Sequence, residues 1–72
     1  MDTLATRLRW WRKMCGLTLH EVAEASGISL SYLSDLERGR TLPSLEALEA
    51  IAEVYGLTLG GILVNIRVRS GK

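Results

Sequence analysis

The sequence predicts an all-α fold in which five short helices form one compact domain. Apolar residues recur three and four positions apart over most of the chain, which is the spacing of one helix face. Phenylalanine is absent and β-branched residues are sparse before Val64, which disfavours strands. Because there are 7 glycines and 1 proline, the breaks between helices are expected at glycines. A chain of 72 residues has room for one domain, and its hydrophobic share of 47% can fill a core.

The first helix is expected to begin at Asp2 or Thr3, either of which can act as the N-cap, and to run to about Cys15. Its inner side is predicted to be an apolar stripe at helical spacing, made of Leu4, Leu8, Trp11 and Cys15. Trp10 lies beside that stripe. Gly16 is expected to end the helix, because glycine readily adopts a positive φ.

A second helix is predicted over about 19–26, because Thr18 and Glu21 have the spacing of a capping box. In this register the inward positions are Leu19, Val22 and Ala23, with Ala25 close by. Gly27 is expected to close the helix.

The stretch 27–40, GISLSYLSDLERGR, is expected to form a tight turn and then a third helix with two different faces. Ser29 is its candidate N-cap, and Gly39 is expected to end it. The inner face is apolar and contains Ile28, Leu33 and Leu36. The outer face is small and polar and contains Ser31, Ser34, Asp35 and Arg38. Such a surface suits a helix that enters the DNA major groove, and with the preceding helix it makes a helix-turn-helix arrangement.

A fourth helix is expected after Pro43, with Ser44 as its N-cap and Gly56 at its end. Its apolar face is predicted to contain Leu45, Leu48, Ile51, Ala52 and Tyr55. The helical pattern therefore continues into the C-terminal third of the chain.

Thr58 is expected to cap a short fifth helix over about 59–64. The segment after it alternates apolar and basic residues, which fits an edge strand as well as a tail without regular structure. The domain is accordingly expected to span 1–66, with a C-terminal tail at 67–72.

Residue composition argues against several classes of function. The single cysteine, Cys15, excludes an intramolecular disulfide and a cysteine zinc site, and we expect it to be a small core residue of a reduced, cytosolic protein. His20 lacks the partners of a metal site, and we find no catalytic triad, carboxylate pair or phosphate-binding loop. No apolar run is as long as a membrane span, and a signal-peptide pattern is absent. We therefore expect no enzymatic activity, metal or cofactor.

The formal charge of +1 and the isoelectric point near 7.9 are weak support for nucleic-acid binding. The distribution of charge is more informative, because the cations gather near the N-terminus, after the third predicted helix and at the C-terminus. These three groups are Arg7, Arg9, Arg12 and Lys13; Arg38 and Arg40; and Arg67, Arg69 and Lys72. A basic face is compatible with this separation.

The segment GLTLHEVAEASGISLSYLSDLERGRTLPSLEALEAIAEVYGLTLGGIL resembles the phage-repressor-like helix-turn-helix family, also called the XRE or Cro type. The landmarks are Gly16-Leu17-Thr18, Val22-Ala23, Gly27-Ile28-Ser29, Tyr32-Leu33-Ser34, Leu36-Glu37-Arg38-Gly39 and Pro43-Ser44-Leu45. The resemblance covers residues 4 to 64. It implies a compact five-helix, lambda-repressor-like domain that binds double-stranded DNA with its second and third helices. It further implies a transcriptional regulator, expected to be a homodimeric repressor on a palindromic operator. Such a protein would be bacterial or phage-encoded, cytoplasmic and nucleoid-associated.

The resemblance also implies roles for individual residues. The family's base-reading positions correspond to Leu30, Ser31, Ser34 and Asp35. Its phosphate-binding positions correspond to Thr18, Ser29, Tyr32, Arg38, Arg40 and Thr41. A structural ion pair of the family corresponds to Arg12 and Glu37.

The apolar cluster near the C-terminus is larger than the core of one domain needs. We therefore expect it to provide a dimer contact from part of the set Leu59, Ile62, Leu63, Val64 and Ile66. A dimer would supply the affinity that one sparse reading helix lacks.

The chain departs from the family pattern at Leu19 and Leu30, where many members carry a polar residue that contacts DNA. Leu30 fits either contact with a thymine methyl group or a half-exposed helix start. Asp35 fits an acceptor for a cytosine amine, a group that repels phosphates, or a simple exposed residue. Trp10 stands where the family often has a polar residue. These departures leave a second function open, namely a protein-interaction module of the same fold, such as an antitoxin or an adaptor.

Overall fold

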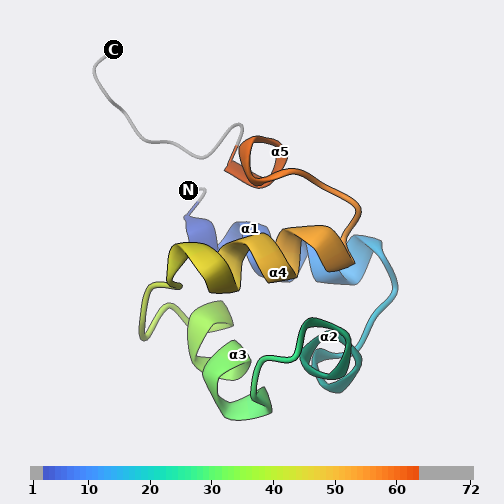
Figure 1. The fold of residues 1–72 in the computed structure, drawn as a ribbon. Coiled ribbons are helices and arrows are strands. Elements are labelled where there is room, and N and C mark those ends of the chain that lie inside the picture. The colour runs from blue at the N-terminus through green and yellow to red at the C-terminus, as the bar shows by residue number, and fades with distance from the viewer. Residues whose placement is uncertain (1–2, 64–72) are drawn as a thin grey trace, which may run out of the picture.

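The computed structural model describes residues 3–63, which form five helices and, within that range, no strand (Figure 1). The helices are α1 (Leu4–Met14), α2 (Leu19–Ser26), α3 (Leu30–Glu37), α4 (Leu45–Val54) and α5 (Leu59–Leu63). Among them, none has the length and apolar character needed to cross a membrane. The all-α prediction is confirmed. The alternatives for the C-terminal tail concern residues outside the described range.

Side-chain caps begin the helices where the sequence predicted them. The hydroxyl of Thr3, not Asp2, caps α1 and accepts a hydrogen bond from the Thr6 N–H at 3.1 Å. The hydroxyl of Ser44 caps α4 and accepts from the Ala47 N–H, also at 3.1 Å. Each hydroxyl satisfies one backbone N–H that lacks a partner inside the helix.

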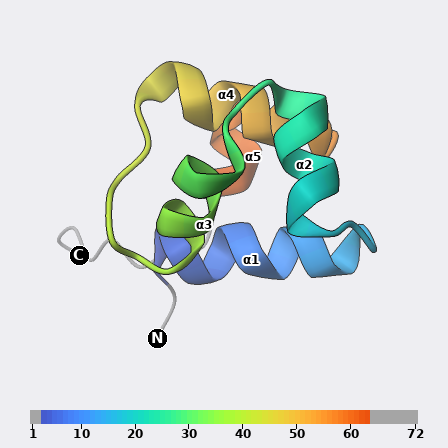
Figure 2. The same cartoon turned by 90° about the horizontal axis from the view of Figure 1, so that it is seen from below.

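The two long helices, α1 and α4, run in nearly the same direction along opposite sides of the molecule (Figure 2). On one side α2 and α3 close the space between them, and α5 closes the other (Figures 1 and 2). α2 packs against both α3 and α4, whereas α1 contacts α3 and α5. The largest fully buried side chains are Leu8, Val22, Leu33, Leu36, Ile51 and Ile62. Every helix therefore contributes a residue to one shared core.

The turn between α2 and α3 depends on Gly27, whose φ is 77°. This left-handed conformation is strained for a residue with a Cβ atom, so glycine is the residue that suits it. The other predicted stops, Gly16, Gly39 and Gly56, also have positive φ. The tight turn fixes how α3 leaves α2.

Several burial predictions were wrong. Cys15 is exposed rather than part of the core, because it lies at the C-cap of α1, where the chain is already leaving the core. Leu45 is 63% exposed because it is the first residue of α4, ahead of the elements that cover the rest of that helix. Helical spacing identifies a face, but the packing of the neighbouring helices decides whether a residue at a helix end is covered: Tyr55, at the C-cap of α4, is buried.

Ile62 was expected to take part in a dimer contact. The structure places it at 0% exposure in the core of the single chain, because α5 lies against both α1 and α4. Its side chain is therefore not available to a second protomer. The side chains of Leu59 and Leu63, and all of Val64 and Ile66, lie outside the described part of the chain.

Candidate nucleic-acid interface

An ion pair between Arg12 and Glu37 joins α1 to the last residue of α3. The Arg12 Nε atom donates to Glu37 Oε2 at 2.9 Å and to Oε1 at 3.1 Å, and a terminal nitrogen donates to Oε1 at 3.0 Å. The Glu37 side chain is only 5% exposed. These hydrogen bonds to the carboxylate raise the pKa of Arg12, although burial opposes the shift. The predicted partners are thus in direct, multidentate contact, a geometry that fixes orientation as well as distance.

Two further contacts extend this arrangement. The remaining terminal nitrogen of Arg12 donates to the Leu17 carbonyl at 3.0 Å, which ties the connection before α2 to the same guanidinium. Arg9, one turn earlier on α1, donates to the backbone carbonyl of Glu37 at 3.3 Å. The end of α3 is therefore held to α1 through both its side chain and its backbone.

Tyr55 and Trp11 place polar atoms in the interior, and Tyr55 lies near this ion pair. The Tyr55 hydroxyl and the Trp11 indole N–H are buried and have no hydrogen-bond partner among residues 3–63. Burial raises the pKa of the Tyr55 hydroxyl, and the nearby Glu37 charge raises it further. Tyr55 is consequently neutral under ordinary conditions.

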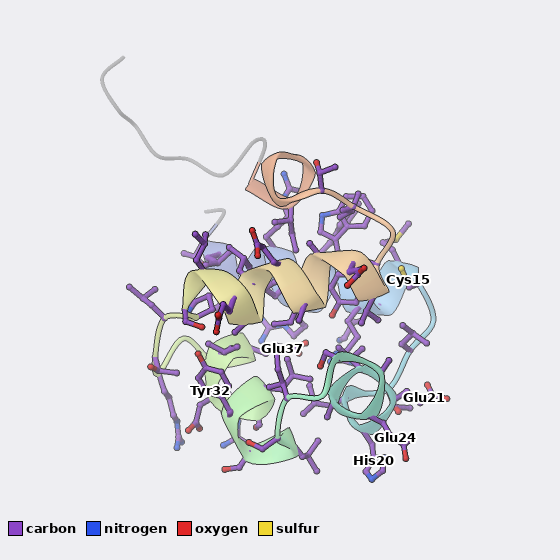
Figure 3. The ribbon with its side chains drawn as sticks, in the orientation of Figure 1. Cys15, His20, Glu21, Glu24, Tyr32 and Glu37 are labelled. Carbon is purple, nitrogen blue, oxygen red and sulfur yellow. The ribbon has the colours of Figure 1, made fainter. Side chains whose placement is uncertain are left out.

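The N-terminal half of α3 is fixed by its cap and by Tyr32. The hydroxyl of Ser29 accepts from the Tyr32 N–H at 3.1 Å, so it begins the helix. The phenol oxygen of Tyr32 accepts from the Ser44 N–H at 3.2 Å, which connects α3 to the start of α4. Figure 3 shows Tyr32 on the side of α3 that faces this connection. Ser29 and Tyr32, which are two of the six predicted phosphate-binding residues, thus each make a hydrogen bond that holds α3 in place.

The four predicted base-reading residues lie on the side of α3 away from the core. Leu33 and Leu36 are fully buried, whereas Leu30 is 44% exposed and Ser31 is exposed. Ser34 and Asp35, one turn later, are half-buried. The most accessible readers are therefore in the first turn, which is the part of a recognition helix that contacts base edges.

The start of α2 carries a complete capping box. The Thr18 hydroxyl accepts from the Glu21 N–H at 3.0 Å, and a Glu21 carboxylate oxygen accepts from the Thr18 N–H at 2.8 Å. This places a carboxylate at the helix end where a phosphate would bind. Glu24 and His20 point outward from the same helix (Figure 3). The N-terminus of α2 is thus poorly suited to an anion while Glu21 is charged.

The cations available to phosphate lie after α3. Arg38, Arg40 and Thr41 are all exposed in the segment between α3 and α4. A hollow near the C-terminal end of α3 is lined by Arg9, Arg38 and Ser34 among others. Arg9, which the sequence offers with Arg7 as a further candidate for phosphate binding, thus lies beside the end of α3.

A family model described as "Helix-turn-helix" matches residues 8–62. That range runs from the first fully buried leucine of α1 to Ile62 of α5.

Individual proteins show the same relationship. The HTH-type transcriptional regulator DdrOP3 of Deinococcus deserti is 51% identical over 63 residues, which cover 88% of this chain and 49% of that protein. The chain spans about half the length of the curated relatives it matches. It is thus similar to one part of each.

Solved structures of SinR, a regulator of Bacillus subtilis, are also similar. SinR in complex with DNA matches with a TM-score of 0.80 at 34% identity, over 85% of this chain and 98% of that one. The complex of SinR with SinI matches with a TM-score of 0.83 at 30% identity, over 97% of this chain and 69% of that one. The likeness therefore includes proteins solved with DNA and with a protein partner.

Proposed function

Because this chain belongs to the phage-repressor-like helix-turn-helix family, we propose that it is a transcriptional regulator that binds double-stranded DNA with α3 in the major groove. The observation that carries the proposal is the division of α3 into a fully buried side and an exposed first turn. Leu33 and Leu36 anchor the helix while Leu30 and Ser31 face outward. SinR, 34% identical over most of this chain, has been solved in complex with DNA and supports the proposal.

Base reading in this proposal rests on Leu30, Ser31, Ser34 and Asp35. Ser31 offers a hydroxyl that both donates and accepts, and Leu30 offers an apolar surface for a thymine methyl group. Neither side chain makes a bidentate contact of the kind that arginine makes to guanine. Sequence preference per half-site is therefore modest.

Phosphate binding rests on Arg38, Arg40 and Thr41, with Ser29, Tyr32 and Thr18 as polar neighbours. The Tyr32 hydroxyl accepts from the Ser44 amide and still has its own hydrogen to donate. Thr18 contributes less than the others, because Glu21 occupies its backbone N–H. The affinity of one protomer is expected to be low and strongly salt-dependent.

Dimerisation would compensate for this low affinity. We propose a homodimer whose reading helices lie ~34 Å apart on one face of a palindromic operator. Its contact would use Leu59, Leu63, Val64 and Ile66, without the buried Ile62. A repressor of bacterial or phage genes would act in the cytoplasm on nucleoid DNA, which is where we place this protein.

The proposal is tested by measuring DNA binding against salt concentration. A binding site is first selected from a random-sequence library and then cut to a duplex that holds a single site. Arg40→Ala should weaken binding to every duplex and reduce the salt slope by about 0.9, since one phosphate contact is lost. Ser31→Ala should instead change the preference at one base position. Lys13→Ala on α1 removes the same charge and should leave the slope on this duplex unchanged.

Two outcomes would contradict this assignment. If Arg40→Ala altered the preference at one base position only, the roles assigned to α3 and to the segment between α3 and α4 would be wrong. If the protein showed no salt-sensitive binding at micromolar concentration, DNA binding itself would be wrong.

The second outcome would favour a protein-interaction module. The specific observation for that alternative is Leu30, which exposes 44% of an apolar side chain at the position where a reading helix is most accessible. The complex of SinR with SinI gives a precedent among similar proteins.

A further inference from the structure

The two long helices carry charged residues of opposite sign. α1 contains Arg7, Arg9, Arg12 and Lys13 and no acidic residue. α4 contains Glu46, Glu49 and Glu53 and no basic residue, and all three glutamates are exposed. Neither the Arg12–Glu37 ion pair nor the proposed DNA contacts use these glutamates or Lys13.

These charges lie on opposite flanks of the molecule. Figure 2 shows α1 along one edge and α4 along the other, with α3 between them and toward the viewer. The recognition helix therefore faces a third direction. A second copy shifted sideways would bring its α1 against the α4 of the first, and both copies would still present α3 to the same side.

The exposed side of α1 also carries an aromatic side chain, that of Trp10, which neighbouring side chains already hold in place. Trp10 is 46% exposed and packs edge-on against Trp11, with ring centroids 5.0 Å apart and an angle of 82°. The Arg7 guanidinium lies 5.7 Å from the centre of the Trp10 ring. Met14, at the end of the same helix, is 63% exposed. Preorganised aromatic residues of this kind are common anchors of protein interfaces.

We propose that the flank formed by Trp10, Lys13 and Met14 docks on the flank formed by Glu46, Glu49 and Glu53 of a second copy bound to neighbouring DNA. The occupant is a second copy because the chain itself carries the complementary charges. The contact is head-to-tail, so it leaves a free basic flank at one end and a free acidic flank at the other. It is distinct from the dimer contact near α5.

The contact is weak between copies that are free in solution and effective between copies that are bound side by side on DNA. Exposed ion pairs contribute little individually and are screened by salt. DNA that holds two copies side by side raises their effective concentration, so the same contact becomes cooperativity. We expect the second copy to bind about 10-fold more tightly than the first, which is typical of coupling between sites.

The direct test uses cross-linking with a carbodiimide, which joins an amine to a carboxylate in contact. Unlabelled and 15N-labelled protein are mixed on a duplex long enough for several copies, and cross-linked peptides are identified by mass spectrometry. The expected result is a cross-link between Lys13 of one isotope and Glu46, Glu49 or Glu53 of the other. It should disappear on a half-site duplex, which holds a single copy, and at high salt.

Charge reversal gives the matched comparison. Lys13→Glu should remove the roughly 10-fold cooperativity while the affinity for a single-copy duplex changes little. Adding Glu49→Lys and Glu53→Lys to Lys13→Glu should restore cooperativity, since the flanks again carry opposite charges. Glu24→Lys changes an exposed acid on α2 and should not restore it.

Because this inference rests on the proposed DNA binding, the two failures must be told apart. Copies that fill the long duplex without the mixed-isotope cross-link, or with unchanged cooperativity in Lys13→Glu, would overturn the inference alone. If the chain did not bind DNA, the proposed function would fail. The cross-link would then be sought in concentrated protein at low salt, where its presence or absence decides whether the two flanks meet.

Discussion

The buried pair of Arg12 and Glu37 makes the sharpest prediction about how α3 is held. Replacing Arg12 with methionine keeps an unbranched, flexible side chain but leaves the Glu37 carboxylate, 5% exposed, without its donor. Three hydrogen bonds to that carboxylate are lost, together with the one to the Leu17 carbonyl. The variant should therefore be strongly destabilised.

The magnitude follows from burial. Removing one partner of a buried ion pair costs about 3–5 kcal/mol, because the remaining charge is left uncompensated. For a domain of this size each kcal/mol lowers the melting temperature by roughly 4–8 °C. A loss on the order of 3 kcal/mol thus corresponds to a fall of roughly 12–24 °C. Replacing both residues, as in Arg12→Met with Glu37→Leu, should recover most of the loss, since apolar pairs often substitute well for buried ion pairs.

Urea and thermal unfolding followed by circular dichroism would measure both variants. DNA binding of the double variant, measured well below its melting temperature, separates the effect on stability from the effect on the orientation of α3. We expect it to bind DNA more weakly than the natural chain, because apolar packing does not fix the angle of α3 as a multidentate ion pair does. A loss below about 1 kcal/mol for Arg12→Met would refute the reasoning, because that is the range of an exposed pair.

Three further substitutions test other parts of the structure. Because the pKa of Tyr55 is raised in the folded chain, the phenol of the unfolded chain ionises first as the pH rises. The free energy of unfolding should therefore fall by about 1.4 kcal/mol per pH unit above roughly pH 10. Tyr55→Phe should flatten this slope in alkaline unfolding titrations. Gly27→Ala should cost about 1–2 kcal/mol in urea unfolding from φ strain alone, since no atom lies within 4 Å of the added Cβ; a larger loss would indicate a clash. Glu21→Gln keeps an acceptor for the Thr18 N–H but removes the negative charge. Binding isotherms should therefore show a higher DNA affinity, while the stability of the fold stays nearly unchanged. An unaltered affinity would mean that DNA does not approach the start of α2.

The sequence by itself determined the helices and the unit they form. Helix limits depend on contacts a few residues long, and the sequence displays those directly. The hydroxyls of Thr18, Ser29 and Ser44 cap the helices that were predicted from them, and Gly27 adopts the positive φ that its turn requires. Hydrophobic spacing within α3 likewise identified Leu33 and Leu36 as core residues.

Only the tertiary structure decided which neighbour each helix face meets. Ile62 belongs to the core of the chain itself, whereas Cys15 and Leu45 are exposed, and this difference depends on where the neighbouring helices lie. The tie between Tyr32 and Ser44, the contact of Arg9 with the end of α3, and the opposite flanks of α1 and α4 also emerge only in three dimensions. Helical periodicity gives the direction in which a side chain points from the axis of its helix. What lies in that direction depends on how all five helices pack together.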